Sequence, residues 1–402
     1  MAEATVIKPD LDFVKGVIAA GGDSLKKCYQ CATCSVVCNV SPDKNPFPRK
    51  EMIWAQWGLK EKFIGNPDVW LCHQCNDCTA YCPRGAKPGE VLGAIRKQTI
   101  SQYSSPGFLV NLVNSRKFMP FLFILPAILL FLIISVTGNL SPDGEIIFTK
   151  FMPVFPIQIT FTLALIFGAG VGLLGMKKFW GDMKEANGVT SGDLMGSVIA
   201  MVKELLSHNK FKDCDVSKDR YTSHLLVFYS FIALGIATGL GVVYIDFLHL
   251  ESPFRFGYGT PIKIFGLAGA IAIIAGTFLM MSNRFKNAEK AGLGSYFDWL
   301  LIGLIGTIGL SGALSWITRV AGIAGLAYPV YFIHLVTVFS LFVYLPFSKL
   351  SHMFYRGAAL TFNRYSGRED AAVVLQVAAQ PAAEAEIASA ESEVPKAEEK
   401  TE

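Results

Sequence analysis

Eight of the nine cysteines lie in two short stretches of the chain. The first reads CYQCATCSVVC from Cys28, and the second reads CHQCNDCTAYCP from Cys72. Both have the spacing C-x2-C-x2-C-x3-C, which is typical of proteins that bind a pair of [4Fe–4S] clusters. Such clusters accept and release single electrons. The two quartets therefore predict electron-transfer chemistry.

The same spacing predicts which cysteines share a cluster. Three closely spaced thiolates bind one cluster, while the fourth thiolate of the run reaches the other cluster of the pair. The first cluster is therefore expected at Cys28, Cys31, Cys34 and Cys82, and the second at Cys72, Cys75, Cys78 and Cys38. The remaining cysteine, Cys214, stands alone in the sequence and is expected to be an idle thiol.

Zinc and disulfide bonds are the alternative uses of these cysteines. A structural zinc site pairs two C-x2-4-C halves and has no use for a third closely spaced cysteine. Disulfides are rare in a reducing cytosol, where this segment is expected. The first quartet ends in CNVSP where the second ends in CP. In the predicted arrangement each quartet lends its fourth cysteine to the other cluster, so the two ligand sets are crossed. The difference between CNVSP and CP affects the prediction of crossed ligand sets, and not the prediction that clusters bind.

The rest of the chain is apolar enough to lie in a membrane. Of its 402 residues, 52% are hydrophobic and only 17% are charged. Apolar runs of roughly 18 residues or more predict transmembrane helices. The predicted fold class is all-α, with a helical two-cluster ferredoxin-like head and a six-span transmembrane helix bundle. Spans are expected near 119–137, 153–176, 222–247, 261–281, 296–318 and 328–349.

Composition divides the chain into three parts. Residues 1–105 are charged and rich in cysteine and are expected to form the head, whereas 106–360 form the membrane domain. Residues 361–402 are rich in Ala and Glu and predict a disordered tail. The opening MAEATVIKPD lacks the basic start and apolar core of a cleavable signal peptide.

Basic residues are concentrated in two of the predicted loops. Lys and Arg gather in 177–221 and in 282–295, while the alternate loops carry few. The positive-inside rule therefore predicts a multi-pass protein of the cytoplasmic (inner) membrane, with head, long loop and tail in the cytoplasm. The net charge of +4 is too small to indicate a nucleic-acid partner. Membrane lipid is the expected surrounding.

Four histidines lie at the ends of predicted spans. His224 and His249 are 25 residues apart, close to seven helical turns, so both are expected on one helix face. His334 and His352 are 18 residues apart, or five turns, and are likewise expected on one face. At about 1.5 Å per residue these separations are comparable to the thickness of a bilayer core. His73 and His208 are given no ligand role.

The direction of the spans pairs these histidines across the membrane. His224 and His352 are expected to meet near the cytoplasmic surface, and His249 and His334 near the outer one. Imidazole is a common axial ligand of haem iron. Two b-type haems are therefore predicted, which makes 106–360 a cytochrome b domain. A single haem on the cytoplasmic side is the alternative.

These motifs resemble two known modules. The cysteine-rich head resembles the C subunit of heterodisulfide reductases, and the membrane domain resembles the haem-bearing γ subunit of respiratory nitrate reductases. Their fusion closely resembles the C subunits of quinone-interacting membrane-bound oxidoreductase (Qmo) complexes of sulfate reducers. The resemblance implies an electron path from menaquinone to heterodisulfide reductase A-like FAD and iron–sulfur subunits, and onward to adenylylsulfate reductase.

The resemblance also carries over to single residues. The eight quartet cysteines match cluster ligands, and His334 and His352 match the two histidines of one haem helix. The other haem helix has two histidines about ten residues apart in the nitrate reductase protein. His224 matches the first, but Leu234 stands at the second position, so His249 is the candidate substitute.

Two other classes of function are open at this stage. In one, the membrane domain is a passive anchor for an iron–sulfur relay. In the other, the chain is a secondary transporter, which mid-span charges or an internal repeat would indicate. Neither sign is convincing in the sequence.

The cluster prediction gives a chemical composition to test. Protein purified without oxygen should contain about eight cluster irons and about eight acid-labile sulfides per chain, in addition to haem iron. Iron and sulfide assays on the intact chain measure both. One or two equivalents of zinc without acid-labile sulfide would contradict the prediction.

Overall fold

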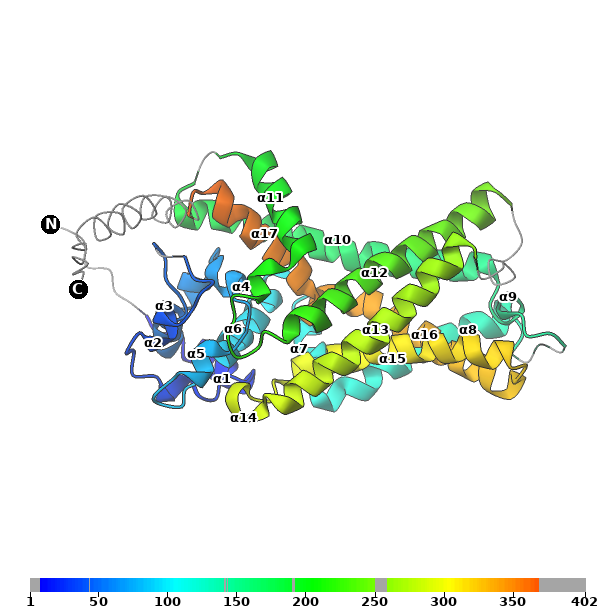
Figure 1. Cartoon of the computed structure of the whole chain (residues 1–402), viewed down its shortest axis with the longest axis horizontal. Coiled ribbons are helices and arrows are strands. Elements are labelled where there is room, and N and C mark those ends of the chain that lie inside the picture. Colours follow the sequence, from blue (N-terminus) through cyan, green and yellow to red (C-terminus); the bar gives the residue numbers. More distant parts are fainter. Residues whose placement is uncertain are drawn as a thin grey trace, which may run out of the picture.

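The computed structural model describes residues 8–42, 44–140, 142, 144–189, 192–249 and 259–368. Over these ranges the chain forms helices, turns and loops with no β-strand, which confirms the predicted all-α fold. The molecule is elongated: short helices form a head at one end, and long helices run side by side from there to the far end (Figure 1).

The head consists of short helices around the two cysteine quartets. Its longest helix, α6 (Pro88–Tyr103), packs against α1, α3, α4 and α5. Pro88 begins α6 at a position where the missing N–H costs no helical hydrogen bond. The other head elements are α1 (Leu11–Ala19), η1 (Leu25–Lys27), α2 (Thr33–Val36), α3 (Arg49–Gln56), η2 (Lys60–Phe63), α4 (Asp68–Leu71) and α5 (Asp77–Ala80).

Six helices are long and apolar enough to cross a membrane, and each predicted span overlaps one of them. The chain is therefore a multi-pass membrane protein. The six are α8 (Met119–Thr137), α10 (Val154–Asn187), α12 (Arg220–Val242), α13 (Pro261–Lys286), α15 (Tyr296–Val320) and α16 (Ala324–Tyr344). Shorter connecting elements are α7 (Phe108–Val113), η3 (Arg116–Phe118), α9 (Phe148–Phe151), α11 (Leu194–Ser207), η4 (Asn209–Phe211), η5 (Val243–Phe247) and α14 (Ala288–Ala291).

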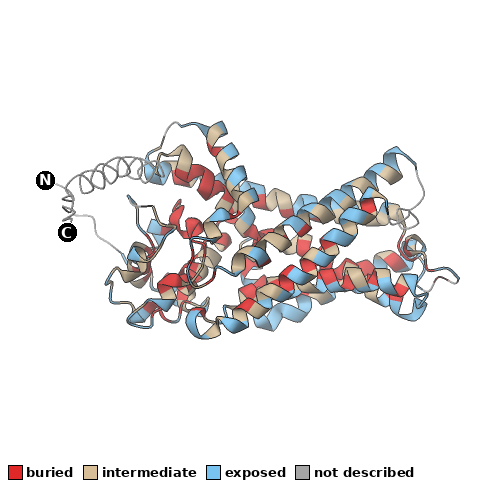
Figure 2. Ribbon diagram, in the orientation of Figure 1, coloured by how far each residue is buried: buried red, intermediate tan, exposed pale blue. Residues whose placement is uncertain are grey.

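Side chains on the membrane helices sort by their surroundings. Large apolar groups such as Leu163 and Phe278 point outward and are exposed, as the pale-blue bands on the long helices show (Figure 2). Several hydroxyl groups inside the bundle are satisfied within their own helix: that of buried Ser230 donates to the Val227 carbonyl oxygen one turn earlier. Such satisfaction is required where no water is present.

The last transmembrane helix ends earlier than the sequence predicted. Helix α16 stops at Tyr344 and is followed by two 3-10 turns, η7 (Leu345–Phe347) and η8 (Lys349–Ser351). Helix α17 (His352–Tyr365) then starts anew. Pro346 has no N–H to continue α16, and the Ser348 side chain accepts a hydrogen bond from the Leu350 N–H. The expectation that His334 and His352 share one continuous helix face is therefore wrong.

Helix α17 joins the head to the membrane domain. Tyr355 stacks on Trp70 of the head, with ring centroids 5.0 Å apart, and packs edge-on against Phe179 of α10. Tyr355, Trp70 and Phe179 all belong to one buried core shared by the two regions. The predicted tail boundary at residue 361 falls inside α17. Residues 369–402, the rest of that tail, lie outside the described residues.

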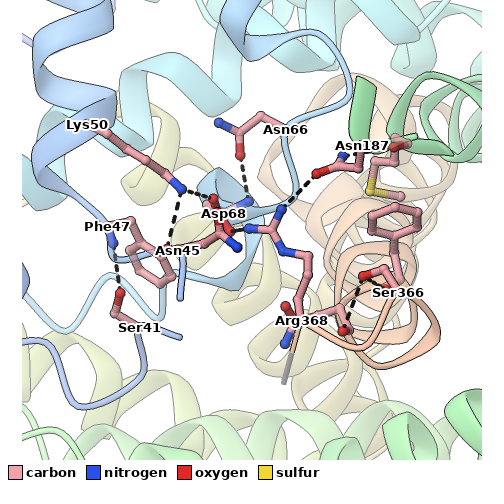
Figure 3. Close-up of polar contacts among 12 residues, drawn as sticks. Ser41, Asn45, Phe47, Lys50, Asn66, Asp68, Asn187, Ser366 and Arg368 are labelled. Carbon is pink, nitrogen blue, oxygen red and sulfur yellow. Dashed lines mark hydrogen bonds and ion pairs between the residues drawn. The ribbon is translucent and has the colours of Figure 1, made fainter. Parts of the chain in front are cut away.

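A buried carboxylate anchors the end of this helix. Asp68 of α4 pairs with Lys50 of α3 at 2.5 Å and with Arg368, just beyond α17, at 2.6 Å (Figure 3). Arg368 also donates to the Asn187 side chain at the end of α10, at 2.9 Å. The Asn66 side chain accepts from the Asp68 backbone N–H at 2.7 Å. Asp68 thus holds α3 and the segment after α17 directly, and Arg368 links both to the end of α10.

Glu51, next to Lys50, makes the stability of this region depend on pH. Burial, and next the negative charge of Asp68, raise the pKa of Glu51 to about 8. The folded-state pKa lies above the unfolded one, so the stability that protonated Glu51 contributes at acidic pH is lost as pH rises towards about 8. The glutamine side chain of the Glu51→Gln variant cannot ionise. The free energy of unfolding of this variant relative to the parent protein should therefore increase by about 2 kcal/mol as the pH rises from 6 to 8.

Thermal unfolding in detergent micelles at pH 6 and pH 8 measures this effect. Glu61→Gln is the matched control, because Glu61 is an exposed head carboxylate and its replacement should leave the pH dependence unchanged. Parallel unfolding temperatures of the parent and Glu51→Gln proteins across this pH range would rule out the ionisation of Glu51 as the cause.

Candidate redox centres

The two cysteine quartets have the same backbone conformation. Gln30 and Ala32 have φ of 62° and 70°, and the equivalent Gln74 and Asn76 have φ of 51° and 69°. In each loop the first cysteine sulfur accepts a hydrogen bond from the backbone N–H two residues later, at 3.4 Å and 3.3 Å. Residues other than glycine seldom adopt a positive φ. Two such residues at equivalent positions of both loops therefore indicate that the loops share one conformation. Amides directed at the sulfurs suit thiolate ligands, whose negative charge they stabilise.

The fold brings together cysteines that are distant in sequence. Cys82, the last cysteine of the second quartet, lines one pocket with the first three of the other quartet, Cys28, Cys31 and Cys34. Cys38 in turn lies close enough to Cys72 and Cys75 for their charges to raise its pKa, and it does the same to Cys78. These neighbours are the ones that the crossed ligand sets require.

Crowding makes these sites unfavourable for bare thiolates. Burial first, and the neighbouring cysteines after it, raise the pKa of Cys34 to about 12 and that of Cys38 to about 12. Iron offsets this cost, because a coordinating cation deprotonates its thiol ligands. Four convergent sulfurs with amide donors fit a [4Fe–4S] cluster.

The two sites differ in their exposure and in their surrounding charges. Cys31 of the first site is exposed, whereas Cys72 and Cys78 of the second are buried. Three arginines converge on the second site from different helices: Arg96 donates to the Val69 and Cys72 carbonyl oxygens, Arg220 to that of Gln74, and Arg356 to those of Trp70, Leu71 and Cys72. Nearby cations favour the more negative, reduced state of a cluster.

Cys214, which the sequence predicts to be an idle thiol, lies beside the second site. Its sulfur, the Cys75 sulfur and an Asp77 carboxylate oxygen all lie within 4.8 Å of one another. Asp77 also accepts hydrogen bonds from the backbone N–H groups of Asp215 and Val216, at 3.0 and 2.9 Å. The loop between α11 and α12 is therefore fixed to the second site. A lone cysteine in a loop gave no sequence signal for this contact.

Two of the four predicted histidine ligands face each other. The rings of His224 on α12 and His352 on α17 have centroids 6.4 Å apart. His352 Nδ1 lies 2.7 Å from the Lys349 carbonyl oxygen, and His224 Nδ1 shares a 2.9 Å hydrogen bond with His208 Nε2. Engagement of Nδ1 fixes the ring and leaves Nε2 for a metal. Both rings fit axial ligands of a haem.

The other predicted pair, His249 and His334, shows no direct contact in the described ranges of the chain. His334 Nδ1 lies 3.2 Å from both the Ser311 hydroxyl and the Ile308 carbonyl oxygen of α15. Gly312 makes room for this ring, since a Cβ there would lie 3.0 Å from its Cε1. His249 is exposed beyond η5, with φ of 51°. Within the described part of the chain, no hydrogen bond or ring contact joins His249 to His334.

An unpredicted row of rings joins the histidine pair to the second cysteine site. His73, next to Cys72, lies edge-on to Phe211 with centroids 5.0 Å apart, and Phe211 lies 5.1 Å from His224. His208 packs beside Phe211 and His224, at 5.7 and 4.9 Å. His73 also contacts the Arg356 guanidinium through Nε2, at 2.6 Å. Only the adjacency of His73 to Cys72 could have indicated this row in the sequence.

A six-helix membrane domain attached to paired cysteine sites defines a membrane-bound iron–sulfur protein. Residues 24–86 match the family model of the 4Fe-4S dicluster domain. The head is 38% identical over 90 residues to the C subunit of the H(2):CoB-CoM heterodisulfide,ferredoxin reductase of Methanothermobacter marburgensis. That match covers 22% of this chain and 48% of the relative, so the chain spans about half the length of that relative.

Two further relatives extend this finding. The heterodisulfide reductase C-subunit-like protein of Archaeoglobus profundus is 33% identical over 85 residues, or 21% of this chain and 45% of its own length. Citrate utilization protein B of Escherichia coli is 25% identical over 289 residues, covering 67% of this chain and 71% of the relative. The second match must include membrane helices. No solved structure matches the chain. The chain is an iron–sulfur electron-transfer protein related through its head to the C subunit of heterodisulfide reductases.

The crossed cysteine arrangement gives a spectroscopic prediction. Cys82→Ser should disturb the same electron paramagnetic resonance signal as Cys31→Ser, because both sulfurs line the first site. Cys38→Ser should disturb the other signal, together with Cys75→Ser. Spectra of the four reduced variants, prepared without oxygen, decide the matter. A Cys82→Ser spectrum that matches Cys75→Ser would refute the crossed ligand sets.

Proposed function

We propose that this chain is the membrane subunit of a quinone-linked oxidoreductase. It carries single electrons between menaquinone in the bilayer and flavin-containing partner subunits, through haem b and two [4Fe–4S] clusters. The row of rings from His224 through Phe211 to His73 is the observation that carries the proposal. It links the membrane histidines directly to the second cysteine site.

His224 and His352 are the proposed axial ligands of the haem on the head side. Haem supplies reversible one-electron chemistry, which a two-electron quinone needs when its partners are one-electron centres. The protein residues hold the two imidazoles: Lys349 fixes His352 through its carbonyl oxygen, and His208 fixes His224. A second haem at His249 and His334 is the further part of the proposal.

The two clusters act in series within the head. The second, held by Cys72, Cys75, Cys78 and Cys38, faces the histidine pair. The first, held by Cys28, Cys31, Cys34 and Cys82, faces outward, as the exposure of Cys31 supports. Electrons between the membrane and a partner therefore pass through the second cluster and then the first.

The proposed partners follow from the relatives and from the resemblance of the two modules. Relatives of the head are named as subunits of heterodisulfide reductases, which supports partner subunits for this chain as well. We propose heterodisulfide reductase A-like FAD and iron–sulfur subunits in the same complex, with adenylylsulfate reductase as the acceptor in dissimilatory sulfate reduction. The basic loops at 177–221 and 282–295 support a head in the cytoplasm.

Haem content is the direct test of the membrane part. Dithionite-reduced protein should show the sharp α band of a haem with two histidine ligands. His224→Ala and His352→Ala should each remove the same single haem, because one imidazole alone holds haem weakly. Pyridine haemochrome assays count the haem, and cluster signals serve as the folding control. A parent protein without an α band would leave only an iron–sulfur protein anchored in the membrane.

His249→Ala tests the second haem separately. If His249 and His334 share a haem, His249→Ala and His334→Ala should lose the same equivalent and keep the other. Redox-monitored absorption spectra distinguish the two haems by potential. Full haem content in His249→Ala would remove His249 from the ligand set and favour the single-haem alternative.

A further inference from the structure

The first cysteine site opens on a surface that the membrane domain leaves free. Cys31 is exposed, and the neighbouring Tyr29 has 67% of its surface exposed. A large aromatic side chain in this position is costly for an isolated surface, and Tyr is enriched at protein interfaces. At the second site, by contrast, Cys72 and Cys78 are buried.

The charged residues that line the pocket of the first site have one sign. Its pocket is lined by two exposed arginines, Arg49 and Arg84, and by no acidic residue. The Arg84 guanidinium lies 4.0 Å from the centre of the Tyr29 ring and makes a cation–π interaction with it. Lys26 and Lys27, just before Cys28, are exposed as well. This face therefore attracts anions.

A second pocket on the head has a different charge pattern. It lies beside the second site, near Asp77, and is lined by both Lys212 and Lys218 and the acidic Asp213 and Asp215. With Asp77, three carboxylates line this pocket against two lysines, so positive charge does not prevail there. Only the pocket of the first site combines an exposed cysteine, an exposed aromatic ring and unbalanced positive charge among the described residues.

We propose that the first-site face, defined by Lys26, Lys27, Tyr29, Arg49 and Arg84, is the docking surface for an acidic one-electron redox protein. On docking, one electron leaves the reduced first cluster and reduces the partner's redox centre by one electron, with no bond made or broken. This inference rests on the proposed function, because it needs a cluster at Cys31. Opposite charges on the two surfaces speed their encounter and select the partner.

Stopped-flow electron transfer tests the docking surface. Intact protein is reduced with dithionite, desalted without oxygen and mixed with an acidic flavodoxin or with a basic cytochrome c. Flavodoxin should be reduced quickly at low salt and more slowly as salt screens the charges. Arg84→Glu should lower the rate of electron transfer to flavodoxin by about tenfold and make this rate less dependent on salt. The rate of electron transfer to cytochrome c should rise.

Matched variants separate docking from folding and from cluster loss. Lys62→Glu makes the same charge change at an exposed head residue outside the pocket, and it should leave the flavodoxin rate nearly unchanged. The double variant Lys26→Glu/Lys27→Glu should act like Arg84→Glu without touching the contact with Tyr29. Equal effects of Lys62→Glu and Arg84→Glu, or no effect of Arg84→Glu, would overturn the proposed surface.

Cluster spectra taken on the same samples keep the two proposals apart. If Arg84→Glu retains both reduced cluster signals and transfers electrons slowly, docking is the step affected. If the parent protein shows no [4Fe–4S] signal at all, the proposed function fails first, and the docking surface falls with it. Intact clusters with rates that do not depend on the charge of this face refute the docking surface alone.

Discussion

Much of the structure depends on the hydrogen bonds that three arginine side chains donate to backbone carbonyl oxygens of residues 69–74. Arg96, Arg220 and Arg356 reach the carbonyl oxygens there from α6, α12 and α17. One of these helices belongs to the head, one spans the membrane, and one follows the last span. A guanidinium group offers several donors in a fixed plane, so each arginine can hold more than one carbonyl oxygen. The second cysteine site is consequently built by both parts of the chain at once.

This shared construction explains why the head and membrane domain have one core. Trp70, Tyr103, Phe179 and Tyr355 pack together where a linker between independent domains would carry few contacts. Asp68 adds an ion pair to Arg368, and Cys214 adds a contact to Cys75 and Asp77. A rigid junction keeps the row of rings between His73 and His224 at fixed spacing. The proposed electron transfer between the two parts depends on this spacing, because the rate of electron transfer falls steeply with distance.

Local patterns made the sequence informative about elements and cysteines. The apolar runs predicted all six membrane helices, because length and hydropathy suffice for that purpose. The C-x2-C-x2-C-x3-C spacing predicted which cysteines become neighbours, since the ligand geometry of a cluster is built into short loops. The prediction that His334 and His352 lie on one helix face was wrong. Pro346 prevents α16 from continuing, so the two residues belong to different helices.

Contacts between distant segments could not be predicted from one sequence. His208 and Phe211 lie in a polar loop, and Arg356 follows the last span, so no periodic pattern connects them with Cys72. Cys214 had no second cysteine beside it to indicate a role. The contacts of these residues can be recognised only in the folded structure, where α11, α12 and α17 pack against the head.

In the proposed electron path, electrons cross between the bilayer and the head through His224 and His352. Its most direct test uses dithionite-reduced protein in liposomes, desalted without oxygen and mixed with a lipid-soluble menaquinone analogue. Freeze-quenched electron paramagnetic resonance follows the reoxidation of both clusters in the parent protein and in His352→Ala. The account predicts fast reoxidation in the parent and reoxidation slowed by about tenfold or more in the variant, with both clusters intact. Equal rates in the two proteins would contradict it.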